Sequence, residues 1–193
     1  MLKNNLIAAF LRNQGGNLMK KNSAVRIATI GIMSALATGL MFLEFPIFPS
    51  VNFLKFDPSD ILPLLAGFIF GPIDGILVLL IKDILFFLLK SGDIVGIAMN
   101  FAAGASFLLP AIYIYRIRKN RAFEIIGYVV GVVVVAGVMT VLNMIVVPLY
   151  WKIPLQETLK YLPIIAAFNA IKFSIDAVVT SLIRERIARI FEN

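Results

Sequence analysis

Apolar segments, separated by short polar or proline-containing stretches, fill most of the chain. A helix needs about 20 apolar residues to cross a bilayer. Five segments come close to that length: Ala24–Leu43, Ile73–Leu89, Val95–Tyr115, Ile125–Val147 and Leu162–Ile183. A sixth segment, Ile61–Phe70, would span only about 15 Å as a helix, against a hydrocarbon core of about 30 Å. The pattern predicts an all-α integral membrane protein with six helices if the short segment also crosses.

Composition supports the membrane assignment. Apolar residues make up 60% of the 193 residues and charged residues 15%, whereas soluble domains have about 45–50% and about 25%. A chain of 21.3 kDa with a mean hydropathy of +0.93 cannot bury that surplus in a small soluble fold. The absence of Cys and His excludes disulfides and removes the usual metal ligands.

The placement of basic residues indicates that the short segment crosses. Twelve of the 18 lie before or at the start of the first segment, after the fourth and after the sixth. These are Lys3, Arg12, Lys20, Lys21 and Arg26, then Arg116, Arg118, Lys119 and Arg121, then Arg184, Arg186 and Arg189. The positive-inside rule places all three groups in the cytoplasm, which requires two crossings between the first and fourth helices. The net charge of +7 thus fits six spans with both termini cytoplasmic and calls for no nucleic-acid partner.

Residues 1–18 differ from the rest of the chain. Gln14-Gly15-Gly16 can be encoded by a sequence that reads as a bacterial ribosome-binding site just before the codon for Met19. We therefore expect an N-terminal extension over 1–18 that is either a short amphipathic segment or not translated natively, and a single membrane domain over 19–193.

Polar side chains recur inside the predicted helices, where lipid makes them costly and marks them as candidate functional groups. They are Lys82, Asp83, Asn100, Asn143, Asn169, Lys172 and Asp176. Asn169, Lys172 and Asp176 share one helical face, and most of the set lies in the outer half of the membrane. Residues 44–60 precede them as a loop rich in Phe and Pro, which could act as a lid. The plainer alternative is that the lysines and aspartates only neutralise each other.

Small residues four apart form a ladder on the first predicted helix. Gly31 and Ala35 belong to it, and such small-xxx-small steps allow another helix to approach closely. Two interpretations remain open, packing within this chain and docking of a partner. The sequence contains neither a phosphate-binding G-x-x-x-x-G-K-[ST] motif nor a D-x-x-D cluster for magnesium. We therefore expect no ATPase activity, no catalytic or metal site and no cofactor of its own.

Several motifs together resemble one family, the riboflavin-specific S components (RibU family) of bacterial energy-coupling-factor (ECF) vitamin transporters. The resemblance covers roughly residues 24–190. It rests on Phe45-Pro46, Asp57-Pro58-Ser59-Asp60, Phe70-Gly71-Pro72, Gly92-Asp93-Ile94-Val95-Gly96, Asn100-Phe101, Ala103-Gly104-Ala105-Ser106-Phe107, Leu142-Asn143 and Phe168-Asn169-Ala170-Ile171-Lys172.

The resemblance implies a six-helix, non-enzymatic subunit of the bacterial cell membrane. Such a subunit captures riboflavin outside and docks on a transmembrane T subunit with two cytoplasmic ATPases, which alone use ATP. It further implies that Asn100, Asn143, Asn169 and Lys172 bind the vitamin and that Leu54 and Phe56 cover it. Gly31 and Ala35 match the docking motif, with Gly where Ala is more typical. Asp176, unmatched in the family, is expected to support Lys172 as its counter-ion.

Two alternatives remain. The chain could be an S component for another flat vitamin, since a shared fold does not fix the ligand. It could also be a small membrane enzyme that uses the pair Lys82/Asp83 or the pair Lys172/Asp176.

Overall fold

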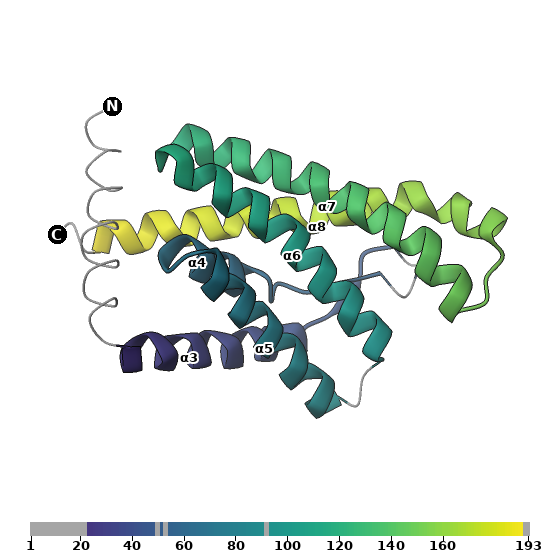
Figure 1. Cartoon of the computed structure of the whole chain (residues 1–193), viewed down its shortest axis with the longest axis horizontal. Helices are drawn as coiled ribbons and strands as arrows, with labels where there is room; N and C mark the ends of the chain where they lie inside the picture. The colour runs from purple at the N-terminus through teal and green to yellow at the C-terminus, as the bar shows by residue number, and fades with distance from the viewer. Residues whose placement is uncertain (1–22, 49–50, 52–53, 91–92, 191–193) are drawn as a thin grey trace.

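A bundle of helices accounts for nearly all of the chain in the structure, a computed structural model that describes residues 23–48, 51, 54–90 and 93–190, with side chains to 186. The helices in this part are α3 (Ser23–Met41), α4 (Ile61–Ile69), α5 (Pro72–Lys90), α6 (Ile94–Arg118), α7 (Arg121–Tyr150) and α8 (Leu155–Ile190) (Figure 1). Each of the six expected segments is helical; α5, α6, α7 and α8 extend past the predicted ends, whereas α3 ends two residues before the predicted Leu43. The proposed extension over 1–18 lies outside the described residues.

Four of these helices are long and apolar enough to cross a membrane, namely α3, α6, α7 and α8. The helix α4 has only nine residues, and α5 carries Asp74, Lys82, Asp83 and Lys90 within its 19 residues. The described helices therefore divide into four that could cross by their own hydrophobicity and two that could not.

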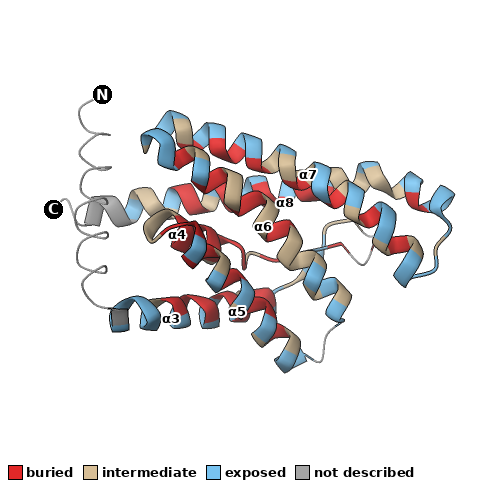
Figure 2. Cartoon of the chain, in the orientation of Figure 1, coloured by how far each residue is buried: buried red, intermediate tan, exposed pale blue. Residues whose placement is uncertain are grey.

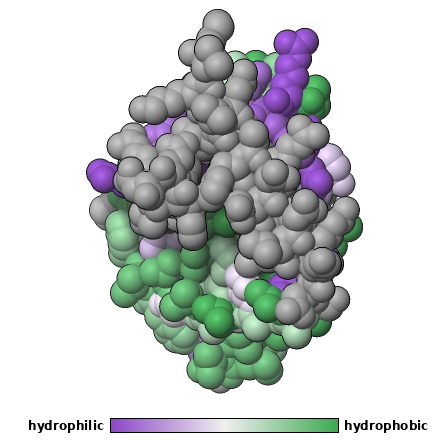
Figure 3. Space-filling model, turned by 90° about the vertical axis from the view of Figure 1, so that its left-hand side faces the viewer, coloured by the Kyte–Doolittle hydropathy of each residue, from purple (hydrophilic) through white to green (hydrophobic). Residues whose placement is uncertain are grey.

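The arrangement brings three chain segments to one end of the bundle. The start of α3, the connection between α6 and α7, and the end of α8 lie together at the left of Figure 1. Viewed from that end, hydrophilic residues gather in the upper part of the face and hydrophobic residues cover the lower part (Figure 3). Of the basic groups, Arg26 ion-pairs with Asp74 of α5, and Arg184 ion-pairs with Glu124 of α7 at 3.0 Å. Of the basic residues that the positive-inside rule assigns to the cytoplasm, those in the described segments at this end include Arg26, Arg121 and Arg184.

Local sequence signals explain where the helices begin and end. Asp93 caps α6 by accepting a hydrogen bond from the Val95 amide. Asn120 caps α7 by accepting one from the Phe123 amide. These are preferred N-cap residues because their side chains satisfy an otherwise unpaired backbone N–H. Gly71 adopts φ +131° between α4 and α5, a conformation that a side chain would strain.

Close packing of α6 against α7 depends on two glycines. A Cβ on Gly127 would lie 2.5 Å from the Ala111 carbonyl oxygen, and one on Gly131 would lie 2.8 Å from the Phe107 ring. Small residues let helix backbones approach closely, which drives association where lipid offers no hydrophobic gain. The Phe107 ring then meets Phe173 of α8 with centroids 4.8 Å apart. The three helices form one packed unit in this way.

Burial runs opposite to the pattern of a soluble protein. The outward faces of α3, α6, α7 and α8 expose large apolar side chains, whereas α4 is mostly buried (Figure 2). The buried positions include eight Asp, Glu and Lys residues: Asp57, Asp60, Asp74, Lys82, Asp83, Glu124, Lys172 and Asp176. Apolar outside and charged inside is the arrangement expected of a membrane protein.

The loop over 44–60 contains a short element that we did not predict. Strand β1 (Phe45–Pro46) pairs antiparallel with β2 (Lys55–Phe56), and the rings of Phe45 and Phe56 lie 5.5 Å apart. The loop then packs on the start of α8, where Val51, Leu54 and Phe56 join Ile165 and Phe168 in one hydrophobic cluster. The apolar residues of this loop are thus used for docking on the bundle.

Candidate functional site

Two lysines lie in the interior, one on α5 and one on α8. Lys82 has an exposed fraction of 0% and Lys172 of 3%. An isolated ammonium in such a place would be prohibitively costly, so each requires a carboxylate close by. Both find theirs in the segment between β2 and α4.

Asp57 and Asp60 supply the opposing charges. The Lys172 ammonium donates to Asp57 Oδ2 at 2.8 Å and lies 2.9 Å from Asp60 Oδ2. The other Asp60 oxygen, Oδ1, accepts from the Lys82 ammonium at 2.7 Å. Asp60 therefore bridges the two lysines, and one short segment neutralises charges on two different helices.

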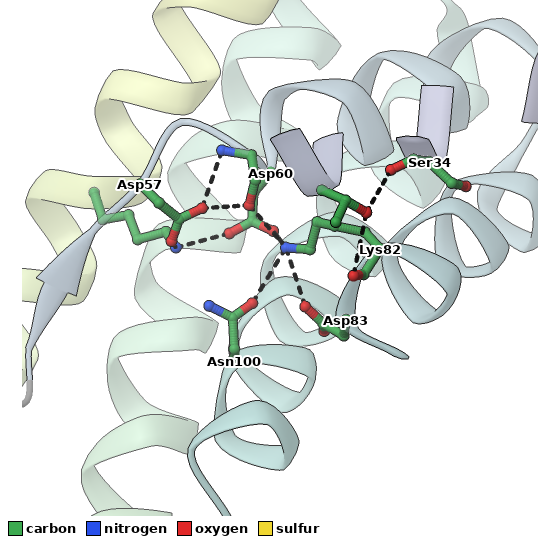
Figure 4. Close-up of polar contacts among 9 residues, drawn as sticks. Ser34, Asp57, Asp60, Lys82, Asp83 and Asn100 are labelled. Atoms are coloured by element: carbon green, nitrogen blue, oxygen red, sulfur yellow. Dashed lines mark hydrogen bonds and ion pairs between the residues drawn. The ribbon is translucent and has the colours of Figure 1, made fainter. Parts of the chain in front are cut away.

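The turn that holds these carboxylates is fixed by its own hydrogen bonds. Asp57 Oδ1 accepts from the backbone amide of Ser59 at 3.0 Å, which is the local bonding typical of an Asx turn. The Ser59 hydroxyl donates to the same oxygen and accepts from Lys82 at 2.9 Å. Figure 4 shows Asp57, Asp60 and Asn100 gathered around Lys82, with Asp83 beside it. The polar turn is buried but well supplied with partners.

The three asparagines come from three helices. Asn100 of α6 accepts a hydrogen bond from Lys82 at 3.2 Å. Asn143 of α7 donates to the Met139 carbonyl at 2.7 Å, and Asn169 of α8 donates to the Ile165 carbonyl at 2.8 Å. Each of the last two amides is held by its own helix, and no described residue donates a hydrogen bond to its carbonyl oxygen. These oxygens are suited to accept from a ligand N–H.

Leu54 and Phe56, the expected lid residues, are buried at 8% and 9% exposure. They pack on α8 in one cluster with Ile165 and Phe168, and Phe168 directly precedes Asn169. Hollows of about 270 and 400 Å³ are lined by α6 with α7 and by α7 with α8, and neither is lined by an expected ligand residue. Lys172 itself is 3% exposed beside this loop.

Asp176 is placed differently from the expectation that it pairs with Lys172. The ion pairs of Lys172 within the described residues go to Asp57 and Asp60. Both Asp176 oxygens are fully buried without a hydrogen-bond partner in that same part of the chain. The i,i+4 spacing on α8 suggested a local pair, but the ammonium of Lys172 reaches across to the loop. We did not predict Asp57 and Asp60 as partners of Lys172. The sequence held one signal for them, because the interior lysines need carboxylates and these two acids lie in the loop just before α4.

The small-residue ladder on α3 faces outward. Gly31 and Ala35 are exposed, and a Cβ on Gly31 or Gly39 would meet nothing within 4 Å. The other side of α3, with Ile30, Met33 and Ala37, packs inside. Within the described residues, this ladder therefore does not pack against another helix of the chain.

Metal binding has no support in the described part of the chain, which holds no group of three Asp or Glu residues able to coordinate an ion. The charged cluster at the centre consists of ion pairs and hydrogen bonds.

A helical membrane bundle with an interior polar site beneath an apolar loop defines a class of small-molecule binding membrane subunits. Residues 25–184 match the family described as "ECF transporter, substrate-specific component", and the chain belongs to that family. The family assignment confirms the prediction of a transporter component and does not support the alternative of a small membrane enzyme.

Relatives agree with the family assignment. The chain is 39% identical over 170 residues to riboflavin transporter RibU of Staphylococcus aureus (strain TCH60), covering 84% of this chain and 90% of the relative. It is 31% identical over 170 residues to riboflavin transporter FmnP of Bacillus subtilis (strain 168), covering 82% and 89%. A solved structure of the S component of a bacterial ECF transporter superposes with a TM-score of 0.81 at 36% identity, covering 89% of this chain and 100% of that one.

Proposed function

We propose that this chain captures riboflavin at the outer face of a bacterial cell membrane and delivers it through an ATP-driven ECF module. The observation that carries the proposal is the interior position of Lys172, Asn143 and Asn169 beneath the docked loop of Leu54 and Phe56. Relatives named riboflavin transporters match over most of the chain.

The chemistry of this site suits a flat heteroaromatic ring system. Riboflavin presents ring carbonyls that accept hydrogen bonds and a ring N–H that donates one. Lys172 is a charged donor, and the carbonyl oxygens of Asn143 and Asn169 are acceptors. Leu54 and Phe56 would cover the ring faces. A few fixed polar groups in an apolar site give orientation and specificity.

The same proposal includes a topology of six crossings with both termini in the cytoplasm. The short α4 is about 14 Å long by its nine residues. It is preceded by Asp57, Ser59 and Asp60, which are all buried. Irregular backbone is tolerated at membrane depth only where protein surrounds it. We infer that this buried segment and α4 complete one crossing together.

We assign the outward face of α3 to docking on the transmembrane T subunit. The face is open at Gly31 and Gly39, and Ile27, Ile32 and Leu36 beside it are exposed at 69%, 61% and 58%. Two cytoplasmic ATPases on the T subunit would supply the energy, so that this chain needs neither ATP nor a cofactor of its own.

The test is the identity of the small molecule held by the protein after purification in detergent. Expression in riboflavin-containing medium should give a yellow protein with flavin absorbance, released on denaturation. A colourless protein that binds a different flat vitamin tightly would contradict the riboflavin assignment while keeping the family.

A further inference from the structure

The Lys82 ammonium lies outside the set of side chains to which the proposed function assigns ligand contacts. It is fully buried in the middle of α5, and removing a charge from water carries a large cost that must be compensated by close partners. Lys82 differs in this respect from Lys172, although both belong to the same cluster.

Counting donors separates the two lysines. An ammonium has three N–H donors. Lys82 uses all three on protein, donating to Ser59 Oγ at 2.9 Å, Asp60 Oδ1 at 2.7 Å and Asn100 Oδ1 at 3.2 Å. Lys172 makes one hydrogen bond, to Asp57, and one further ion pair, to Asp60. Lys172 therefore retains donor capacity for a ligand, and Lys82 does not.

Lys82 also orients a carboxylate that touches Lys172. Because Asp60 Oδ1 is held by Lys82, its Oδ2 is directed toward the Lys172 ammonium. Asp60 precedes α4 as its N-cap residue, yet its side chain makes no capping hydrogen bond. The carboxylate is used for the two lysines instead of for its own helix.

A second connection runs to α6. Because Lys82 donates to the Asn100 carbonyl oxygen, the contact occupies the acceptor of this amide and leaves the two N–H donors of its NH₂ group unused. Asn100 is half-buried, and no described residue accepts from its NH₂ group. Asn100 can therefore offer two N–H donors to a ligand, and these complement the carbonyl acceptors of a ligand ring.

We infer that Lys82 is a positioning residue, which sets Lys172 through Asp60 and sets the Asn100 amide directly. The inference rests on the proposed function, since it concerns the same ligand site. A lysine in the interior of α5 would in this way serve the site through protein groups alone. The ligand class that fits two positioned donor groups is a planar ring with adjacent carbonyl acceptors.

The experiment is a double-mutant cycle on riboflavin affinity, measured by flavin fluorescence quenching with the purified full-length protein. The variants are Lys82→Met, Lys172→Met and the combination of both. Lys82→Met should weaken binding about tenfold or more, the effect expected when hydrogen bonds to charged groups are lost. In the double variant the two effects should fall well short of multiplying, because Lys82 acts through Lys172 and Asn100. Two effects that multiply, or a Lys82→Met affinity equal to the wild type, would overturn the inference.

Lys82→Met removes one of the two lysines that Asp60 bridges and leaves Asp60 with Lys172 alone, so that variant alone could fail to fold. The pair Lys82→Met/Asp60→Asn removes both charges of the Lys82–Asp60 ion pair and keeps the Lys172–Asp57 pair, so it should fold, yet it should bind as weakly as Lys82→Met. Wild-type affinity in this pair would overturn the inference. Lys160→Met, an exposed lysine on the same helix as Lys172, is the control and should bind as the wild type does. If the wild type itself fails to bind riboflavin, the proposed function falls and the inference with it. If the wild type binds riboflavin and the Lys82 variants bind it equally well, the inference is wrong while the proposed function stands.

Discussion

Lys172 and Asp57 are 115 positions apart in the chain, yet the Nζ of one donates to the Oδ2 of the other at 2.8 Å. The contact ties the inner end of the loop to the centre of α8. Asp57 follows β2 directly, so movement of the loop would separate this carboxylate from the Lys172 ammonium. Opening the loop would leave the lysine with Asp60 as its remaining ion-pair partner among the described residues.

Replacing Asp57 by Asn should loosen the loop. An amide oxygen can still accept from the Ser59 amide, so the turn is kept while the charged partner of Lys172 is lost. We expect riboflavin affinity to fall by about 1–3 kcal/mol and hydrogen exchange over residues 54–60 to accelerate. Asp93→Asn is the matched control, because Asn caps a helix as well as Asp does. Unchanged exchange in the loop of Asp57→Asn would contradict this link.

Removing the Lys172 ammonium should weaken riboflavin binding directly. Lys172→Ala takes away a charged donor and leaves a ligand acceptor unpaired, at a cost of about 1–3 kcal/mol. Equilibrium titration of the purified protein measures the effect. Lys160→Ala should leave the affinity unchanged, and equal affinities for Lys172→Ala and the wild type would show that Lys172 is not a ligand contact.

Filling the small-residue face of α3 should separate binding from transport. Gly31→Leu adds a large side chain at a position with open space, so the isolated subunit should bind riboflavin normally. Uptake by cells should fail because the T subunit could no longer approach closely. Gly137→Leu, at a similarly open glycine on α7, should bind and transport. Normal uptake by Gly31→Leu would place the docking surface elsewhere.

The outer end of the loop should open in acid. Glu44 pairs with Lys55 of β2 at 2.7 Å and with Lys90 of α5. Partial burial alone would raise the pKa of Glu44, but hydrogen bonds and charge from the two lysines outweigh it and lower the pKa below its ordinary value of 4.5. A lowered pKa means that the pair stabilises the folded state fully above pH 4.5 and that this contribution is lost as the pH falls through the folded-state pKa.

Limited proteolysis of the loop as a function of pH checks this expectation. Cleavage between residues 44 and 56 should increase as the pH falls below 4.5. In Glu44→Gln, cleavage should be elevated at neutral pH and should depend little on pH in that window. The same acid-induced step in both proteins would mean that another group controls the loop.

Packing between α6 and α7 should be intolerant of a single methyl group. Gly127→Ala would place a Cβ 2.5 Å from the Ala111 carbonyl oxygen, forcing the helices apart. Overpacking of this kind costs about 1–3 kcal/mol, which a thermal unfolding curve in detergent would show as a lower midpoint. Gly137→Ala, with open space around it, should be at least as stable as the wild type.

The helices and the interior polar residues could be predicted from the sequence because hydrophobic length and the cost of polar groups in lipid are local properties. The partners of those residues could not. Asp57 and Asp60 lie in a loop that we expected to act as a lid. Neither its composition nor its local pattern indicates that it enters the bundle. Asp176 stands four positions after Lys172 and so looked like its partner. The choice between docking and internal packing for Gly31 likewise depends on which face of α3 meets α5.

The nine residues of α4 also bear on how the protein is made. A segment so short, containing Pro63, offers too little apolar length to be recognised and released into the bilayer on its own. It is buried against α3 and α5, and its entry depends on a salt-bridged turn whose lysines arrive later, on α5 and α8. During synthesis, the turn before α4 therefore lacks its ion pair with Lys172 until α8 has emerged. The loop that carries Asp57 can form its ion pair with the bundle only after Lys172 has been synthesised.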